Sequence, residues 1–167
     1  MTSFKSILVV LTALCLWSQA RAETPEEWIA LGTRIHGAFG SFIPVGIRIG
    51  LDARERLRAE PRDLTVIYYS GAKAPCPCIV DGIMLATTAS PGQGTLQVAP
   101  GKAPAGALGV AIIRNKKTGE AVKYTVADDW LGRLIEFNKS YDPIDRYDAV
   151  MAAEELFTVD SVAVAKN

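Results

Sequence analysis

The stretch ALGVAIIRN-KKTGE-AVKYTVA, residues 107–127, decides which class of fold to expect from this sequence. Two runs rich in aliphatic and β-branched residues flank a short polar segment that contains Gly119. Such runs favour β-strands, and a short glycine-containing connection between them is typical of a β-hairpin. The sequence therefore predicts an antiparallel hairpin over residues 108–126.

Outward from the hairpin, the pattern predicts two more strands and five helices. The strands are expected at 63–70 and 94–99, where β-branched and aromatic residues gather. Helical spacing of apolar residues and helix-starting signals predict helices at 25–36, 44–60, 79–89, 128–137 and 147–157. The tail 158–167 is left open between an edge strand and a frayed end. This order predicts a single α+β domain with N-terminal helices, a mostly antiparallel sheet and C-terminal helices.

Local sequence signals specify the ends of the first predicted helix and one face of the second. Thr24 and Glu27 have the spacing of a capping box, and Gly37 is a typical stop, which places His36 at the helix end. Gly46 and Gly50 share one face of the second helix, where each costs about 1 kcal/mol. We expect another backbone to approach this face. The glycine face and an exposed hairpin edge would also suit a homodimer.

Residues 1–22 have the features of a signal peptide. Lys5 precedes the apolar run SILVVLTALCLW, and Ala20-Arg21-Ala22 is an A-x-A cleavage site. We expect cleavage after Ala22, a mature domain of residues 23–167 in the periplasm, and no stable membrane anchor afterwards. The alternative is an uncleaved anchor, although the apolar run is short for a membrane span.

The charge balance excludes some partners. Removing two of the eighteen basic residues, Lys5 and Arg21, leaves 16 basic against 18 acidic residues in the mature chain. A near-neutral domain lacks the basic surface that nucleic-acid binding requires. We expect no nucleic-acid partner, and the cysteine segment described next favours a metal ion or a small-molecule ligand.

The segment APCPCIVDG, residues 74–82, carries both cysteines of the predicted mature chain, Cys76 and Cys78. With His36 they would make three ligands for zinc or another transition metal, and Asp81 would support the site. Lys73 and Arg48 are candidate supporting cations, because a positive charge favours thiolate. An ordinary role for Arg48 at the surface of a buried helix remains the alternative.

Two other interpretations of the cysteines stay open. In an oxidising compartment they could form a reversible thiol–disulfide pair with His36 as acid or base. They could also form a static bridge, although a Cys-x-Cys ring encloses a very short loop and gains little entropic stabilisation. The single histidine, without a nucleophile-elbow motif, offers no Ser-His-Asp arrangement. Whether the protein is an enzyme is left open.

Two motifs resemble the FmdE-like family, which is named after formylmethanofuran dehydrogenase, and the resemblance covers roughly residues 28–130. In the first motif, a histidine followed by a Gly-x-Arg-x-Gly pattern, the matching residues are His36, Gly37, Gly46, Arg48 and Gly50. In the second motif, a cysteine and aspartate followed by a glycine-rich turn, they are Cys78, Val80, Asp81, Ile83, Thr87, Gly92, Gly94 and Leu96.

This chain departs from the family at several of its soft ligands. Family histidine, cysteine and lysine positions are occupied here by Ala38, Gly40, Ala89 and Gln93, the C-terminal zinc ribbon is missing, and Cys76 is an addition. The resemblance implies a metal-related site around His36 and Cys78, with Gly92, Gln93 and Gly94 as a candidate ligand-binding loop. It does not imply formylmethanofuran dehydrogenase activity, because that chemistry uses a molybdenum or tungsten cofactor on other polypeptides.

Overall fold

The computed structural model describes residues 22–163 of the chain. The predicted signal peptide therefore lies outside the described residues, apart from Ala22, and stays a prediction. Among the residues that are described, no helix has the length and apolar character needed to cross a bilayer.

A five-stranded sheet forms one layer of the domain, in the order β2-β1-β3-β4-β5. Its strands are β1 (Leu64–Ser70), β2 (Leu96–Val98), β3 (Ala107–Asn115), β4 (Ala121–Ala127) and β5 (Thr158–Val162). The predicted hairpin is confirmed as β3 and β4, which pair antiparallel with Arg114 opposite Ala121. The Asn115 side chain closes the turn by accepting from the backbone N–H of Lys117 at 2.8 Å.

The sheet is mixed, because β1 and β2 run parallel while the other three described pairs are antiparallel. A parallel pair needs a crossover connection, and the segment between Ser70 and Leu96 supplies one that contains a helix. The prediction of a mostly antiparallel sheet is confirmed, with β2 as the exception. The tail adds β5 beside β4, so the hairpin edge that suited a homodimer is paired within the chain.

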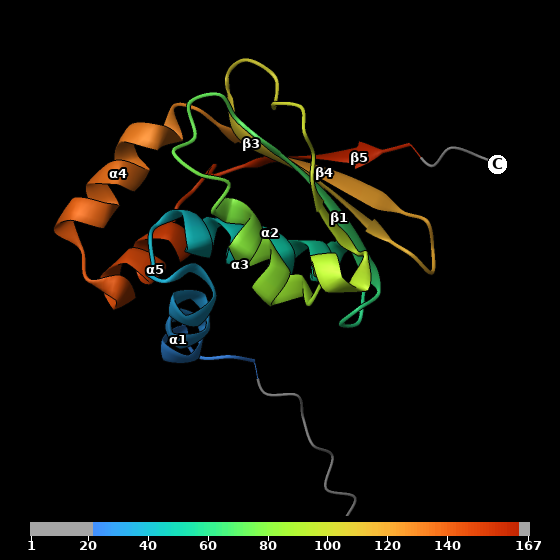
Figure 1. Cartoon of the computed structure of the whole chain (residues 1–167), viewed down its shortest axis with the longest axis horizontal. Coiled ribbons are helices and arrows are strands. Elements are labelled where there is room, and N and C mark those ends of the chain that lie inside the picture. The colour runs from blue at the N-terminus through green and yellow to red at the C-terminus, as the bar shows by residue number, and fades with distance from the viewer. Residues whose placement is uncertain (1–21, 164–167) are drawn as a thin grey trace, which may run out of the picture.

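The described residues form five α-helices. Figure 1 shows α2 and α3 side by side next to the sheet, with α1 beyond them, where it contacts α3 and α5. The bounds of the helices are α1 (Pro25–His36), α2 (Phe42–Arg56), α3 (Ile79–Thr87), α4 (Trp130–Ser140) and α5 (Pro143–Met151). The capping box is confirmed, because the Thr24 backbone N–H donates to Glu27 Oε2 at 2.7 Å and the Glu27 N–H donates to Thr24 Oγ1 at 3.3 Å.

Two predicted helix boundaries were wrong for identifiable reasons. The second helix was expected to reach Glu60, but it ends at Arg56 because Arg58 adopts a left-handed conformation, φ 45°. The last helix was expected to start after Pro143. Instead Pro143 begins it, since a proline is tolerated in the first helical turn, and the Asp142 side chain accepts from the Asp145 N–H.

The glycine face of α2 packs against α3 backbone to backbone. A Cβ atom added at Gly46 would lie 1.9 Å from the carbonyl oxygen of Ile79, and one added at Gly82 would lie 2.0 Å from that of Ile43. The expected close approach is confirmed, and it lies within the chain rather than between two copies. The two features that suited a homodimer are thus both satisfied inside one molecule, which leaves the homodimer a prediction without this support.

Candidate metal centre

His36 is the last residue of α1, and the left-handed Gly37, φ 88°, turns the chain away immediately after it. The helix end projects the imidazole toward the first turn of α3, where Nδ1 lies 2.7 Å from Asp81 Oδ2. Both side chains remain partly accessible, at 32% for His36 and 28% for Asp81. The two residues form an ion-pair-like contact at the surface between α1 and α3.

The two cysteines lie in the loop that leads from β1 into α3. Cys78 occupies the N-cap position of α3 and is buried, while Cys76 is half-buried, and both pack against the main hydrophobic core. They form a disulfide, with their Cα atoms 5.2 Å apart. The oxidised pair therefore stands at the start of the same helix that carries Asp81.

The histidine and the two cysteines meet at one place. One nitrogen of His36 and the sulfur atoms of Cys76 and Cys78 all lie within 4.8 Å of one another. The prediction that a residue near the end of the first helix and a cysteine pair some forty positions later converge on a common site is confirmed. Because Asp81 engages Nδ1, Nε2 is the ring nitrogen left to bind an ion or a proton.

The donor set fits a metal only after the disulfide opens. Ligand atoms around a tetrahedral ion with Zn–N and Zn–S bonds lie about 3.3–3.8 Å apart. The His36 nitrogen and the two sulfurs lie within 4.8 Å of one another, so a small shift of the side chains, in which the two sulfurs part, would be needed to reach that spacing. Thiolate, not disulfide sulfur, is the ligand that zinc requires. The reduced pair with His36 would hold the ion in a three-ligand set.

The two supporting cations predicted from the sequence have other partners. The Lys73 ammonium lies 2.8 Å from Asp128 Oδ2, and this hydrogen bond and the charge of Asp128 raise the pKa of Lys73. Arg48 donates to the carbonyl oxygens of Val150 and Ala153 near the end of α5. No hydrogen bond or ion pair in residues 22–163 joins either cation to the cysteine sulfurs.

The structure thus gives Arg48 the role of joining α2 to α5. Sequence reasoning missed Asp128, although this residue ties down the loop that precedes the cysteines. The acidic pair Asp128-Asp129 indicates only a helix start when it is considered locally. The contact with Lys73 is long-range, so no local pattern could have indicated it.

The glycine-rich turn lies at the opposite end of α3 from the cysteines. Gln93 ends a short 3-10 turn, Pro91–Gln93, and its side-chain amide donates to the Thr88 carbonyl at 3.1 Å. Nine helical residues separate it from the site, a rise of about 12 Å along α3. The structure therefore does not bring Gly92, Gln93 and Gly94 to the His/Cys cluster.

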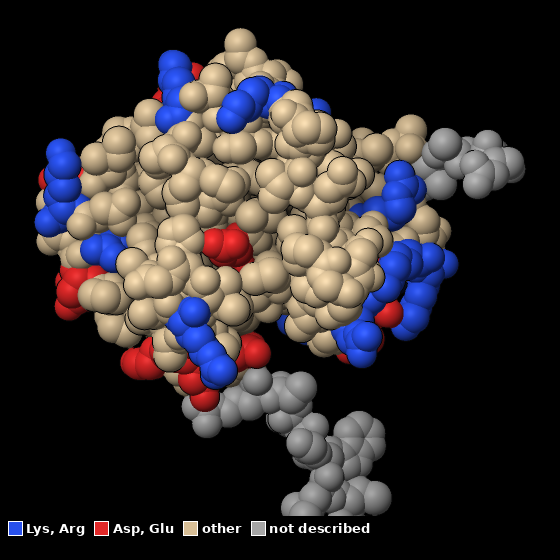
Figure 2. All heavy atoms as spheres, viewed as in Figure 1, with Lys and Arg blue, Asp and Glu red and all other residues tan. Residues whose placement is uncertain are grey.

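The charges around the cluster are sparse on the face seen in Figure 2. One isolated acidic group lies over the start of α3, and a basic side chain lies over α1.

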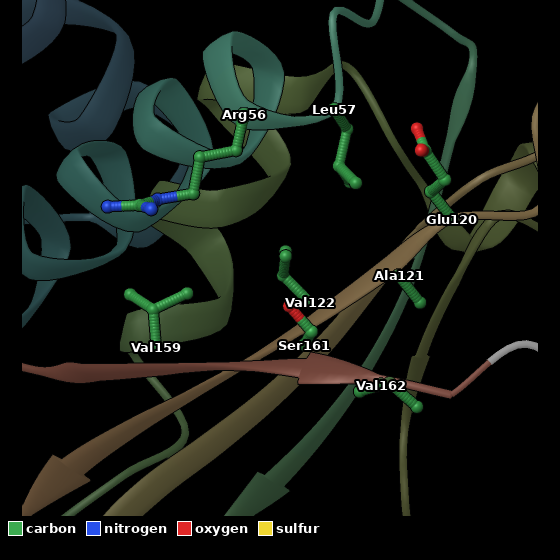
Figure 3. Close-up of a pocket in the computed structure, with 8 residues that line it drawn as sticks. All are labelled: Arg56, Leu57, Glu120, Ala121, Val122, Val159, Ser161 and Val162. Atoms are coloured by element: carbon green, nitrogen blue, oxygen red, sulfur yellow. The ribbon is translucent and has the colours of Figure 1, made fainter.

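An open depression of about 430 Å³ lies elsewhere, between the end of α2 and strands β4 and β5. Figure 3 shows Arg56 and Glu120 on either side of it and the side chains of Val122 and Val159 facing the space between them. None of its lining residues is a histidine or cysteine, and Arg56 Nε is already paired with Asp52 Oδ2 at 2.6 Å. The His/Cys cluster, not this depression, is the candidate site.

Comparison with known proteins agrees with the motifs of the sequence. Residues 35–156 match the family described as FmdE, molybdenum formylmethanofuran dehydrogenase operon. The comparison with curated proteins found no match. The matched span contains His36, both cysteines and Asp81, and it covers well over half of the chain. The chain therefore belongs to the FmdE family.

Proposed function

We propose that this protein, in its reduced form, binds a transition-metal ion, zinc first among them, through His36, Cys76 and Cys78. The observation that carries the proposal is the convergence of one imidazole nitrogen and two sulfur atoms within 4.8 Å of one another. Imidazole and thiolate are the ligands that zinc and its neighbours prefer. Two thiolates would also offset the charge of a divalent ion in a partly buried position.

Three protein ligands would leave one coordination position for water or a small molecule, which is the pattern of open zinc sites. The exposure of the His36 side chain, 32%, puts this position within reach of solvent. Asp81, through its contact with Nδ1, would hold the ring in the orientation and tautomer that ligation by Nε2 needs. A bound ion in such a site acts as a Lewis acid toward its fourth ligand.

Anaerobic titration of the reduced protein with Co²⁺ and Zn²⁺ tests this proposal. We expect one equivalent of bound metal and, for Co²⁺, sulfur-to-metal charge-transfer absorption. Asp81→Asn should weaken binding about 10–100-fold, and His36→Ala, which removes a ligand, should weaken it further. Gln97→Ala, at an exposed position of β2, serves as the control and should bind as the unaltered protein does. Failure of the reduced protein to bind either ion would overturn the proposal.

Thiol–disulfide exchange is a second candidate function, favoured by the Cys76–Cys78 bridge beside the His36–Asp81 pair. A protein with this function would hold no metal and would cycle between disulfide and dithiol with a small dithiol reductant. Reversible oxidation without metal binding would support it. Thiols that react only after denaturation would instead indicate a static bridge.

We further propose that the protein is exported and works in the periplasm. The basic start, the apolar run and the A-x-A site of residues 1–22 support this. The protein recovered from the periplasmic fraction should begin at Glu23, which N-terminal sequencing would establish. A cytoplasmic protein that retains Met1 would contradict the export proposal without bearing on metal binding.

A further inference from the structure

We propose that the Cys76–Cys78 disulfide is a redox switch on the metal site, which a thiol opens by attacking the sulfur of Cys76. This inference rests on the proposed metal-binding function and adds its regulation. Cys76 is the cysteine that the general family motif lacks, so the switch would belong to this chain rather than to every relative.

The switch arises because the disulfide and the metal would use the same two sulfur atoms. The two sulfurs that would ligate the ion are bonded to each other in the structure. A disulfide sulfur carries no negative charge and cannot act as a thiolate ligand. Oxidised protein thus keeps only the imidazole of His36 from the three-ligand set, while reduction restores both missing ligands at the same place.

The two sulfurs are not equivalent targets for an incoming thiol. Cys78 is buried, at 6% exposure, whereas Cys76 is half-buried in the loop before it. Cys78 also sits at the N-cap of the nine-residue helix α3, with no side-chain capping bond. A thiolate leaving at that position meets the positive end of the helix dipole. Attack at Cys76 with Cys78 as the leaving group is therefore favoured.

Reduction by a soluble dithiol balances in two steps. The first thiolate of the dithiol attacks Cys76 Sγ, breaks the Cys76–Cys78 bond, forms a mixed disulfide and releases the Cys78 thiolate. The second thiol then attacks its partner sulfur in the reductant, closes the cyclic disulfide and releases Cys76. The dithiol loses two electrons and two protons, and the cysteine pair gains two electrons. Metal binding holds both cysteines as thiolates, so both protons end in solvent.

The opening would be local. The bridge spans a sequence separation of two, so it closes a very short ring and constrains the unfolded chain little. The surrounding core draws most of its residues from α2, α3 and the sheet, and Cys78 is only one member of that large cluster. Reduction should therefore switch the site while the domain stays folded.

The first test compares Co²⁺ binding by fully oxidised and fully reduced protein, with circular dichroism to show that both are folded. We expect oxidised protein to bind more than about 100-fold more weakly, because two of three ligands are lost. Equal affinity in the two states would overturn the switch. Absence of binding in both states would instead overturn the underlying metal proposal, so the two failures are distinguishable.

The second test asks which sulfur is attacked. Oxidised protein is mixed briefly with excess glutathione, quenched with acid, alkylated and digested for mass spectrometry. We expect the mixed disulfide on Cys76 and the alkyl group on Cys78. The reverse assignment would overturn the order of attack, and a bridge that resists glutathione until the protein is denatured would overturn the switch itself.

Discussion

Helix α3 presents two neighbouring residues to two very different environments. Gly82 lies so close to α2 that an added Cβ would fall 2.0 Å from a backbone carbonyl, whereas Asp81 reaches a partly exposed histidine at the end of α1. The interior contact tolerates no added atom, and the rim contact is open to solvent and reagents. We infer that the α2–α3 contact supplies rigidity and that the α1–α3 rim supplies chemistry, so substitutions should separate stability from binding.

The largest loss of stability is expected when one methyl group is added inside the α2–α3 contact. In Gly46→Ala the new Cβ would lie 1.9 Å from the Ile79 carbonyl oxygen, which is backbone and cannot swing aside. We expect a loss of about 3 kcal/mol or more in the free energy of unfolding. Urea unfolding followed by circular dichroism measures it.

Gly132→Ala is the matched control, because Gly132 lies in α4 with nothing within 4 Å of its added Cβ. It should stabilise the protein by about 0.5–1 kcal/mol, since alanine is the better helix former. If Gly46→Ala were as well tolerated as Gly132→Ala, the interior contact would not have the rigidity assigned to it.

A substitution of Arg48 tests whether this side chain stabilises the fold or contributes to the metal site. In Arg48→Met the carbonyls of Val150 and Ala153 lose their donor, and the contact with the Phe157 ring is lost. We expect destabilisation by about 2–3 kcal/mol, with unchanged metal affinity per folded molecule. Lys102→Met, at an exposed loop position, should change stability by less than about 0.5 kcal/mol. A selective loss of metal affinity in Arg48→Met would assign Arg48 to the site.

Two buried tyrosines differ in the hydrogen bonding of their hydroxyl groups. Tyr124 donates to Asp52 Oδ2 at 2.7 Å, whereas the Tyr68 hydroxyl has no hydrogen-bond partner in the described part of the chain. We expect Tyr124→Phe to cost about 1–2 kcal/mol and Tyr68→Phe to be neutral or slightly stabilising. Chemical unfolding at neutral pH compares them, and an equal loss in both variants would contradict the difference in bonding.

Because of the same two tyrosines, we expect the protein to lose stability at alkaline pH. Burial raises the pKa of both Tyr68 and Tyr124, and for Tyr124 the hydrogen bond to Asp52 adds to it. The folded state therefore keeps a proton that the unfolded chain loses above pH about 10. This contribution to stability is complete below that pH and declines above it by about 1.4 kcal/mol per pH unit for each tyrosine. Tyr68→Phe should show a shallower decline in unfolding measured from pH 9 to 11.

A small effect on stability is expected for the residue with the largest expected effect on binding. His36 is exposed at the end of α1, so His36→Ala should alter the free energy of unfolding by less than about 1 kcal/mol. Metal affinity of the reduced protein should fall strongly in the same variant. A large loss of stability instead would mean that the His36–Asp81 contact holds α1 in place.

Prediction from the sequence was most successful where a cause is local. The capping box of Thr24 and Glu27, the stop at Gly37 and the hairpin turn around Asn115 each depend on residues a few positions apart. It failed where a long-range contact selected among local options. The second helix was expected to continue past Arg56, but the chain turns there through Arg58, and the distant Asn115 side chain donates to the Leu57 carbonyl at 3.0 Å.

The candidate site was predicted in part. Ligand chemistry and the family resemblance group His36, Cys76 and Cys78, and the structure brings them together. The roles of Lys73 and Arg48 could not be predicted, because Asp128 and Val150 lie 55 and 102 residues further along the chain. The glycine turn after α3 matched a family motif. A motif gives the order of residues along the chain, but it does not show that the turn and the cysteines lie at opposite ends of α3.

By itself, the sequence determined most of the strands and helices, the spacing of the glycines and the donor atoms available for a metal. Those properties follow from side-chain chemistry, backbone preference and period, which act within a few residues. Only the tertiary structure decided that β2 runs parallel to β1, that α2 and α3 touch through backbone, and that the end of α1 meets the start of α3 beside two joined sulfurs. Such contacts depend on how whole elements pack around a shared core, and that packing selects partners that no local pattern specifies.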